Sequence, residues 1–568
     1  MHDLVIRGAM IVDGTGASAR TADIAVDAGK IVSVEGKAGA GSREIDADGL
    51  IAAPGWVDIH THYDGQVAWD PYLTPSSWNG VTTVVMGNCG VGFAPVRPGQ
   101  EGYLISLMDA VEDIPSETLS AGIRFEWESF GEYLDALSRM KRTIDIGAHV
   151  PHCAIRPYVM GERGAGNEAA SAEEIAQMAE VVRDSLRAGA LGFSTSRTLV
   201  HRTKDKGYVP GTFAAVAEVG AMARGLGDVG HGVFEIITDI MGEDADLEWV
   251  AKMSQETGRP VSLAALISSR SGMRARELWQ FVTERNERGA HIFNQVPARP
   301  TGILMSLEST LHPFSTHRTF KALAGLSLSE KVARMRDPKV RAEILADSPA
   351  VRDRETLRMV TMFDTIFPLG DPPDYEPSAE SSIGARARAL RLTPQELAYD
   401  TMLENGGRKV LYGPLTYPGY NLDAYREMLT RGNSILSLSD GGAHCGTICD
   451  ASMPTYILSH WARDRSRGEK LPLEFAVKRQ TSETAKLYGL QDRGVLKPGK
   501  KADINLIDFE NLSLRAPETV YDLPAGGRRF VQRAEGYKYT IVSGEVVFRD
   551  GEPTGAMPGK VIRGGQHN

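Results

Sequence analysis

Cysteine is scarce in this chain, and the scarcity excludes one common kind of architecture. Four cysteines are spread over 568 residues, at Cys89, Cys153, Cys445 and Cys449. They are too few and too irregularly spaced for the disulfide framework that stabilises small secreted domains. We therefore expect free thiols, a large hydrophobic core and a cytoplasmic location.

Long apolar runs and blocks of one charge are also missing. No stretch approaches the ~18 apolar residues that cross a bilayer, and residues 1–8 lack the apolar core and cleavage site of a signal peptide. Basic and acidic residues are interspersed, and the net charge is −10. With no basic block and no basic–aromatic stripe, we expect neither a membrane nor a nucleic-acid partner.

The composition is that of a large globular protein. Hydrophobic residues make up 42% of the chain and charged residues 24%, which are ordinary values for a soluble protein. Both ends of the chain contain short apolar segments separated by turn residues, a pattern typical of β-strands. We expect residues 1–53 and 485–568 to form one composite β domain.

The middle of the chain, residues 54–484, alternates strand-like and helix-like segments, which favours parallel β/α architecture. Eight strands are predicted, the number that closes a TIM-type barrel. They lie at residues 56–62, 81–87, 144–150, 190–196, 231–237, 260–266, 290–296 and 434–440. A long insertion at about 299–431 separates the last two, and we expect it to cover the mouth of the active site. The predicted fold is therefore α/β, a TIM-like (β/α)8 barrel with a small composite β domain.

Two histidines end the first predicted strand. His60 and His62 are two residues apart, so on a strand their side chains share one face. Neutral imidazole is a favoured ligand of zinc and related divalent metals. A pair of this kind alone is more often inert, but in a TIM-type barrel the catalytic residues lie at the carboxyl ends of the strands. Asp440 ends the eighth strand, beside the first, where one carboxylate oxygen can bind a metal while the other takes a proton from the attacking water.

Five stretches of the sequence together carry a family resemblance. They are PGWVDIHTHYDGQ, GVTTVVMGNCG, GALGFSTS, SDGGAH and RGVLKPGKKADINLID. The chain resembles the amidohydrolase superfamily, in the branch that contains the N-acyl-D-amino-acid deacylases, or D-aminoacylases. The resemblance implies a TIM-like barrel with a composite β domain and one or two divalent ions, with zinc the first choice. It also implies His60 and His62 as ligands, Cys89 as a thiolate ligand, and Asp440 as ligand and general base.

The chain departs from this branch at the fifth and sixth strands. There the deacylases supply further histidines, whereas this chain has Glu235 in strand five and no histidine at the matching place in strand six. Strand four has no lysine that could be carboxylated into a metal bridge. Glu235 is a candidate replacement ligand, and a buried glutamate paired elsewhere is the alternative. We expect one tightly held metal, or a second one bound weakly.

Three further residues are candidates for substrate binding. His152 lies after strand three, where related sequences place a Gly-His pair, and is a candidate to polarise the substrate carbonyl. Arg197, after strand four, is a candidate to hold a substrate carboxylate. His444 is close enough to Asp440 to orient it or to meet the substrate. For each of the three, a purely structural role is the alternative.

The leading interpretation is a metal-dependent hydrolase of a non-peptide C–N bond, acting on a small-molecule N-acyl amino acid or related amide. The enzymatic alternative is a ring-opening hydrolase of a cyclic amide, such as a lactam, imide or hydantoin-like compound. A catalytically silent scaffold is a third interpretation, whose mark would be the loss of His60, His62 or Asp440; all three are present. The sequence leaves open whether the chain forms a homo-oligomer.

Overall fold

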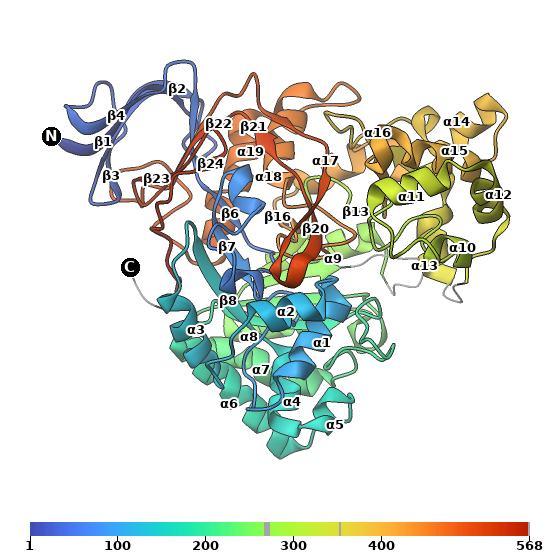
Figure 1. Ribbon diagram of the computed structural model, residues 1–568. Coiled ribbons are helices and arrows are strands. Elements are labelled where there is room, and N and C mark those ends of the chain that lie inside the picture. The colour runs from blue at the N-terminus through green and yellow to red at the C-terminus, as the bar shows by residue number, and fades with distance from the viewer. Residues whose placement is uncertain (266–272, 351–353, 566–568) are drawn as a thin grey trace.

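The structure is a computed structural model that describes residues 1–265, 273–350 and 354–565. The predicted ranges 260–266, 299–431 and 485–568 therefore each include residues outside the described part of the chain. Figure 1 shows three regions: a barrel surrounded by helices, a β region that contains the amino-terminal strands, and a helical lobe to one side. Among the described residues, no helix is long and apolar enough to cross a membrane.

Eight parallel strands form the central sheet of the described barrel. Their order is β16-β12-β11-β10-β9-β8-β7-β6. They are β6 (Trp56–Asp58), β7 (Val81–Met86), β8 (Asp145–Pro151), β9 (Gly192–Arg197), β10 (Val233–Thr238), β11 (Val261–Ala265), β12 (Ile292–Val296) and β16 (Ser434–Leu436). The sheet closes beyond the ends of β6 and β16, where Thr61 and Gly441 form a parallel bridge. The predicted TIM-like fold is confirmed.

Amphipathic helices cover the outside of the barrel. Helix α6 (Ala172–Ala188) begins at a capping box in which Ser171 and Glu174 satisfy each other's backbone N–H groups. Its buried residues Met178, Val182 and Leu186 recur every four positions, so they form one stripe against the sheet. The same alternation of buried strand and half-buried helix places the carboxyl end of every strand at one mouth of the barrel.

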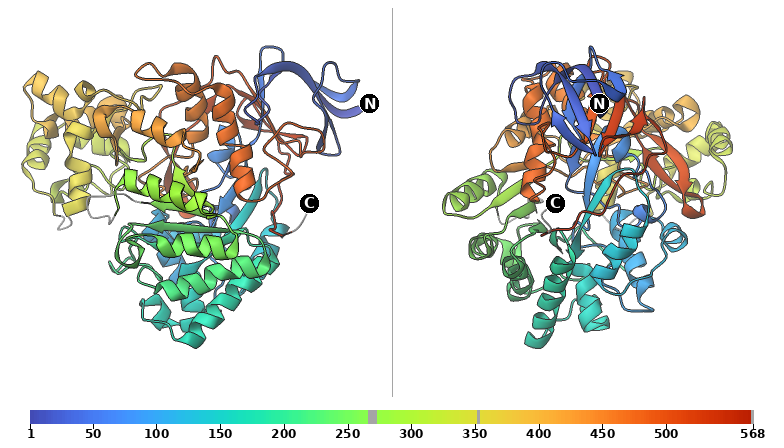
Figure 2. Two further views of the ribbon diagram at one scale, coloured as in Figure 1. Left: turned by 180° about the vertical axis from the view of Figure 1, so that it is seen from behind. Right: turned by 90° about the vertical axis from the view of Figure 1, so that its left-hand side faces the viewer.

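Segments from both ends of the described chain meet in one nine-stranded sheet. The order is β24-β23-β22-β17-β5-β1-β2-β3, with β4 paired to β1. Strand β5 (Ile51–Pro54) pairs antiparallel with β17 (Ile504–Ile507), which joins residues about 450 positions apart. The others are β1 (His2–Ile11), β2 (Arg20–Asp27), β3 (Lys30–Ser33), β4 (Gly41–Asp46), β22 (Tyr537–Val542), β23 (Glu545–Arg549) and β24 (Glu552–Pro553). Both views of Figure 2 show the blue amino-terminal strands beside the red carboxyl-terminal ones.

A buried ion cluster fastens the barrel to the carboxyl-terminal part of the chain. The Asp145 carboxylate on β8 lies 2.6 Å from Arg493 Nη1 and 2.9 Å from Lys501 Nζ, and it accepts a hydrogen bond from the backbone N–H of Lys560. Burial by itself would raise the pKa of Asp145, but Lys501 and Arg493 outweigh it and lower the pKa to about 2. The carboxylate therefore stays ionised.

The insertion between β12 and β16 forms a lobe with its own hydrophobic core. It contains strands β13 (Gly302–Met305), β14 (Phe367–Pro368) and β15 (Leu411–Pro414), and helices that include α10 (Arg318–Lys321), α11 (Leu328–Met335), α12 (Pro338–Ala346), α13 (Arg354–Thr361), α14 (Ile383–Leu390) and α15 (Pro394–Met402). The backbone N–H of Thr310 donates to the Gly446 carbonyl at 2.9 Å. The lobe thus contacts the loop that follows β16.

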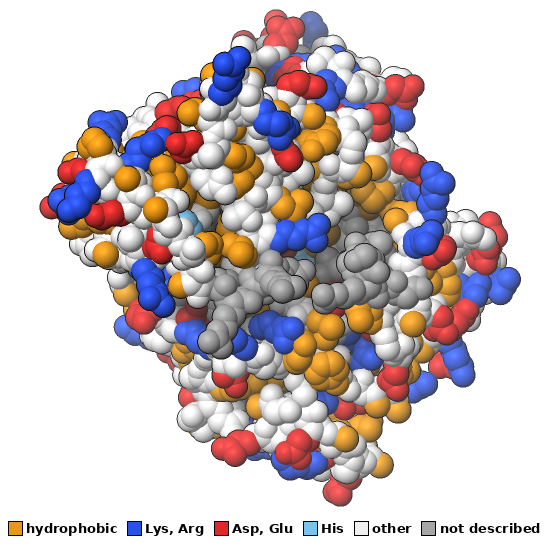
Figure 3. All heavy atoms as spheres, turned by 90° about the vertical axis from the view of Figure 1, so that its right-hand side faces the viewer, with side chains coloured by type: hydrophobic (Ala, Val, Ile, Leu, Met, Phe, Trp, Pro, Cys, Tyr) orange, Lys and Arg blue, Asp and Glu red, His pale blue; other side chains and the backbone are white. Residues whose placement is uncertain are grey.

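On the face shown in Figure 3, acidic and basic side chains of the described residues are interspersed.

Candidate metal centre

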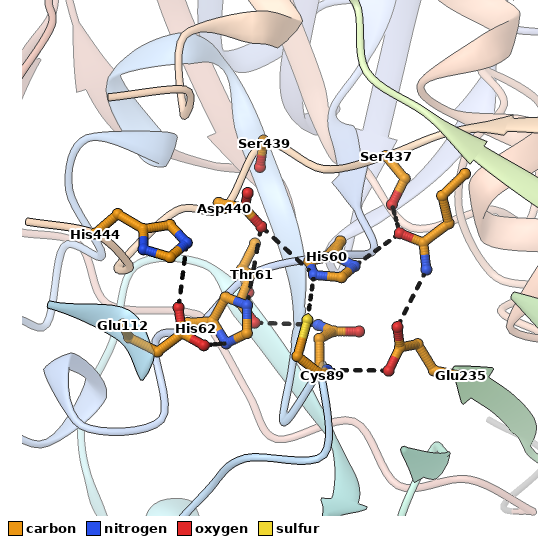
Figure 4. A network of polar contacts seen from close by, with 12 residues as sticks. His60, Thr61, His62, Cys89, Glu112, Glu235, Ser437, Ser439, Asp440 and His444 are labelled. Atoms are coloured by element: carbon orange, nitrogen blue, oxygen red, sulfur yellow. Dashed lines mark hydrogen bonds and ion pairs between the residues drawn. The ribbon is translucent and has the colours of Figure 1, made fainter. Parts of the chain in front are cut away.

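Two buried imidazoles lie just beyond β6. His60 and His62 are each 1% exposed, and their ring centroids are 5.4 Å apart. The regular strand ends at Asp58, earlier than the predicted residue 62, but backbone bonds hold the next residues in place. The N–H of His62 donates to Gly441 at 2.8 Å, and the N–H of Thr61 to Val85 at 3.1 Å. These bonds fix the backbone that carries the two rings against β7 and the loop after β16 (Figure 4).

His60, His62 and Cys89 form a group that could hold a metal ion, with donor atoms within 4.8 Å of one another. His60 Nε2 is 3.3 Å from Cys89 Sγ. Asp440 adjoins this group, with Oδ1 3.4 Å from His60 Nε2 and 3.8 Å from His62 Nε2. Donors that each lie about 2.0–2.3 Å from one zinc ion are separated by comparable distances. Two imidazoles, a thiolate and a carboxylate also suit zinc chemically, so the residues present fit the expected ion.

Cys89 reaches this position through a turn with unusual backbone geometry. Its φ is +54°, in the left-handed region, and its N–H donates to Glu235 Oε2 at 3.0 Å. Gly87, two residues earlier, has a φ of +76°, and a Cβ there would lie 2.5 Å from the His149 carbonyl oxygen. Only glycine fits this approach of two backbones. The Asn-Cys-Gly turn after β7 thus carries the thiol into the barrel mouth.

The far side of His60 is fixed by an amide. His60 Nδ1 is 2.7 Å from Gln295 Oε1, and an amide oxygen only accepts hydrogen bonds. Nδ1 therefore carries the proton, and Nε2 presents its lone pair to Cys89 and Asp440. Gln295, on β12, is held in turn by Ser437 at 2.9 Å and Ser262 at 3.0 Å. Gln295 was not predicted from the sequence, although the two adjacent polar residues Asn294 and Gln295 in an otherwise apolar strand are a signal for it.

A carboxylate that was not predicted faces His62. Glu112 is the last residue of helix α1 (Glu101–Glu112) and is 1% exposed. Its Oε1 is 3.4 Å from His62 Nδ1, and its Oε2 is 3.6 Å from His444 Nε2. It belongs to no recognised motif. A weak signal exists, because an acidic residue at a helix carboxyl end opposes the helix dipole, and such local conflicts concentrate at functional sites.

Glu235 lies behind the turn of Cys89 and is fully buried. Besides the Cys89 N–H, its partner is Gln295 Nε2, 3.4 Å from Oε1. Burial raises the pKa of Glu235 to about 8. Among the described residues, the group of three that could hold a metal does not include it. Glu235 therefore supports the backbone of one candidate ligand, Cys89, and the Gln295 side chain that orients another, His60.

Burial sets the charges of the whole cluster. It lowers the pKa of His60 to about 4 and that of His62 well below its usual value. It raises the pKa of Cys89 well above the usual value and, with Asp450 and Asp58 nearby, that of Asp440 to about 8. Neutral imidazole is the form that binds metals, whereas a thiol and a carboxylic acid must lose protons to do so. A divalent cation supplies the positive charge that stabilises both anions.

Two of the predicted substrate-binding residues lie in other contacts. His152 Nδ1 is 2.8 Å from Thr195 Oγ1 and its Nε2 is 3.0 Å from Glu218 Oε1, so both ring nitrogens have partners. Arg197 Nε contacts both carboxylate oxygens of Asp244, at 3.0 and 2.8 Å. These contacts agree with the purely structural role that was the alternative for both residues. Neither residue belongs to the group of three side chains that could hold a metal ion.

His444 and an unpredicted histidine approach the cluster from loops. The His444 side chain is 25% exposed and contacts Glu112. His201, in the loop after β9, has its Nδ1 2.9 Å from Ser196 Oγ. Burial, with the His444 and His60 imidazoles nearby, lowers the pKa of His201 to about 3. His201 was not predicted from the sequence, because it lies in an irregular segment with no periodic pattern.

A family model described as “Amidohydrolase family” matches residues 43–548. An N-acyl-D-aspartate deacylase of Alcaligenes xylosoxydans xylosoxydans is 27% identical over 570 residues, covering 99% of this chain and 95% of that protein. A D-aminoacylase of the same organism is 26% identical, covering 99% and 97%. Three uncharacterized mycobacterial proteins, from Mycobacterium bovis and Mycobacterium tuberculosis, are 26% identical over 97% of this chain and 92% of their own length.

Solved structures share the fold. A crystal structure of D-aminoacylase superposes with a TM-score of 0.64 at 22% identity, covering 99% of this chain and 100% of that one. The N-acyl-D-glutamate deacylase of Bordetella bronchiseptica, complexed with zinc and a phosphonate inhibitor that mimics the tetrahedral intermediate, gives 0.63 at 23% identity, covering 99% of each chain. Barrel and β region together therefore have a common architecture in these proteins.

Proposed function

The chain belongs to the amidohydrolase family, and on that premise we propose that it removes the acyl group from an N-acyl amino acid or a closely related amide. Membership and the deacylase relatives make it a metal-dependent hydrolase of C–N bonds other than peptide bonds. One observation carries the finer proposal. Three side chains that could hold a metal ion, together with Asp440, converge at the carboxyl mouth of the barrel, in a chain that aligns with N-acyl amino acid deacylases over 99% of its length.

In this proposal His60, His62, Cys89 and Asp440 hold the ion. A divalent cation bound there, zinc in first place, polarises the substrate carbonyl and lowers the pKa of water. Asp440 accepts the proton of the attacking water and later returns it to the amine nitrogen as the C–N bond breaks. The proton is thus conserved, and the products are a carboxylate and a free amine.

The residues after Asp440 pack closely against the segment that follows β6. A Cβ on Gly441 would lie 2.5 Å from Ser76 Oγ and 2.8 Å from the Tyr63 ring. Gly442 has a φ of +88°, in the left-handed region that favours glycine. The loop therefore passes close to the residues that follow β6. This close passage holds the Asp440 carboxylate beside the two histidines.

We expect one ion to be enough for activity. The region beside Cys89 is filled by the hydrogen-bonded side chains of Glu235, Gln295 and Ser262. Glu235 is left as a ligand for a second, weakly bound ion. In a D-aminoacylase of known structure, the binuclear metal centre is described as showing one-metal activation and second-metal attenuation. A single-metal mechanism for this chain agrees with that behaviour.

The test combines metal analysis with a substrate screen. Purified protein should contain about one zinc ion per chain and release free amine from members of an N-acyl amino acid library of both chiralities. The same protein after removal of the ion by a chelator is the matched control. Turnover of cyclic amides alone, with a product whose mass equals substrate plus water, would replace deacylation with ring opening. Absence of bound zinc after reconstitution would contradict the metal centre itself.

A further inference from the structure

The Nδ1 atoms of the two candidate ligands His60 and His62 face different kinds of partner. His60 Nδ1 faces the neutral amide of Gln295, whereas His62 Nδ1 faces the carboxylate of Glu112 at 3.4 Å. Figure 4 shows Glu112 between His62 and His444, which come from the two ends of the barrel domain. A metal-binding histidine normally donates its second ring N–H to an oxygen acceptor of this kind.

Hydrogen bonds within the described part of the chain do not explain why the Glu112 carboxylate is buried. Among the described residues, Glu112 Oε2 and His62 Nδ1 both lack a hydrogen-bond partner. A carboxylate that is 1% exposed without partners is costly. The 3.4 Å separation is slightly longer than a hydrogen bond, so a small rotation of the His62 ring or of the carboxylate completes the bond. Such contacts are often long before the site is loaded and tighten afterwards.

The end of α1 is anchored to the loop that carries Asp440 and His444. The N–H of His444 donates to the backbone carbonyl of Glu112. The next residue, Asp113, accepts from the N–H of Gly446 and from Thr447 Oγ1, both at 3.2 Å. Buried residues of α1, among them Leu104 and Met108, fix the helix to the core. Glu112 is therefore held in place by contacts that do not involve its own carboxylate.

We propose that Glu112 is a positioning residue that fixes His62 in the tautomer with Nε2 facing the metal and tethers His444 beside it. The inference rests on the proposed function only in assuming that His62 binds a metal. Through Glu112 the metal ligands after β6 and the loop after β16 take up their positions together.

The test compares Glu112→Gln, Glu112→Ala and the matched control Glu101→Gln at the other end of the same helix. Zinc affinity is measured by chelator competition on each metal-free protein, and folding by circular dichroism and thermal unfolding. We expect Glu112→Gln to weaken zinc binding about 10–100-fold, with Glu112→Ala at least as weak and Glu101→Gln unchanged. The visible spectrum of the cobalt-substituted protein should change in Glu112→Gln, because the His62 ligand is altered.

A fourth variant, His444→Asn, separates the two tasks. We expect it to keep the zinc affinity of the wild type and to raise KM, whereas Glu112→Gln changes both zinc affinity and turnover. Zinc affinities of Glu112→Gln and Glu112→Ala within about twofold of wild type would overturn the proposal, because they fall short of the expected 10–100-fold loss. So would two zinc ions in wild type and one in Glu112→Gln, since Glu112 would then be a ligand itself.

These measurements also separate this inference from the proposed function. Zinc affinity is determined without substrate, so a loss of affinity in Glu112→Gln supports the positioning role even if no N-acyl amino acid is hydrolysed. Conversely, deacylase activity with unchanged zinc affinity in the Glu112 variants would retain the proposed function and reject the positioning role.

Discussion

At the scale of single residues, we expect His60 and His62 to be ligands of the metal ion. His60→Ala or His62→Ala removes one neutral nitrogen donor from a buried site, so zinc should be lost on dialysis and turnover abolished. The fold should survive, because both rings lie at the barrel mouth beyond the end of β6. Metal content and circular dichroism check this. Full zinc occupancy and near wild-type turnover in His60→Ala would contradict the ligand assignment.

Asp440 is expected to act as ligand and base. In Asp440→Asn an amide oxygen can still meet the ion, but it cannot accept the proton from water. Turnover should fall by ~10²–10⁴-fold, with zinc affinity largely kept. The acidic limb of the pH–rate profile should disappear, because the group that must lose its proton is gone. A variant that keeps more than about a tenth of wild-type turnover would fall outside this range and assign the base role to another group, His444 first.

The site residues that could be predicted belong to a short local motif, whereas those that could not be predicted come from distant parts of the sequence. His60 and His62 belong to a short local motif whose spacing predicts a shared face. Glu112 and Gln295 reach the same site from the end of helix α1 and from strand β12, at long distance in the sequence. Their roles depend on tertiary contacts that no local pattern contains. The same is true of the contacts that engage Arg197 and His152 elsewhere.

At the scale of elements, strand positions were predicted well and strand ends less well. The predicted strand 434–440 stops at Leu436 because Leu438 and Asp440 have φ values of +64° and +49°, which a strand does not accommodate. The apolar, β-branched content of the strands is a local signal. The left-handed turn that carries Asp440 is instead held by a tertiary contact, the hydrogen bond from the Asp440 N–H to the His60 carbonyl oxygen.

The loop after β16 should be sensitive to one added methyl group. In Gly441→Ala the new Cβ meets Ser76 and Tyr63 at 2.5 and 2.8 Å, so the loop must shift and displace Asp440. A displacement of about 1 Å can cost up to about 10²-fold in turnover, while zinc affinity should fall less. Gly102→Ala, which adds its Cβ into open space, is the control. Equal kinetics in both variants would show that the loop adapts without moving the carboxylate.

At the scale of the whole molecule, the Asp145 cluster joins barrel and carboxyl-terminal segments. Asp145→Asn leaves Arg493 and Lys501 with less compensation in a buried position, so we expect a loss of about 3 kcal/mol in the free energy of unfolding near neutral pH. Urea unfolding of both proteins measures it. The domain-level pattern was visible in the sequence as β-rich ends, but this ion cluster was not, because its members are hundreds of residues apart.

The same cluster predicts a pH dependence. The pKa of folded Asp145 is lowered to about 2, below the value of about 3.9 expected in the unfolded chain. The unfolded state therefore binds the proton first, and the stabilisation is complete above about pH 4 and lost as pH falls towards about 2. The stability difference between wild type and Asp145→Asn should shrink below about pH 4. A difference that stays constant from about pH 6 to about pH 3 would contradict this linkage.

The pairing of β5 with β17 imposes an order of events on biosynthesis. At about 5–20 residues per second, a ribosome needs tens of seconds to translate the roughly 450 residues that separate these partners. Throughout that time the nascent amino-terminal strands present an open edge at β5, the kind of edge that invites pairing with other chains. The amino-terminal sheet is thus completed only late in translation, after β17 has been synthesised.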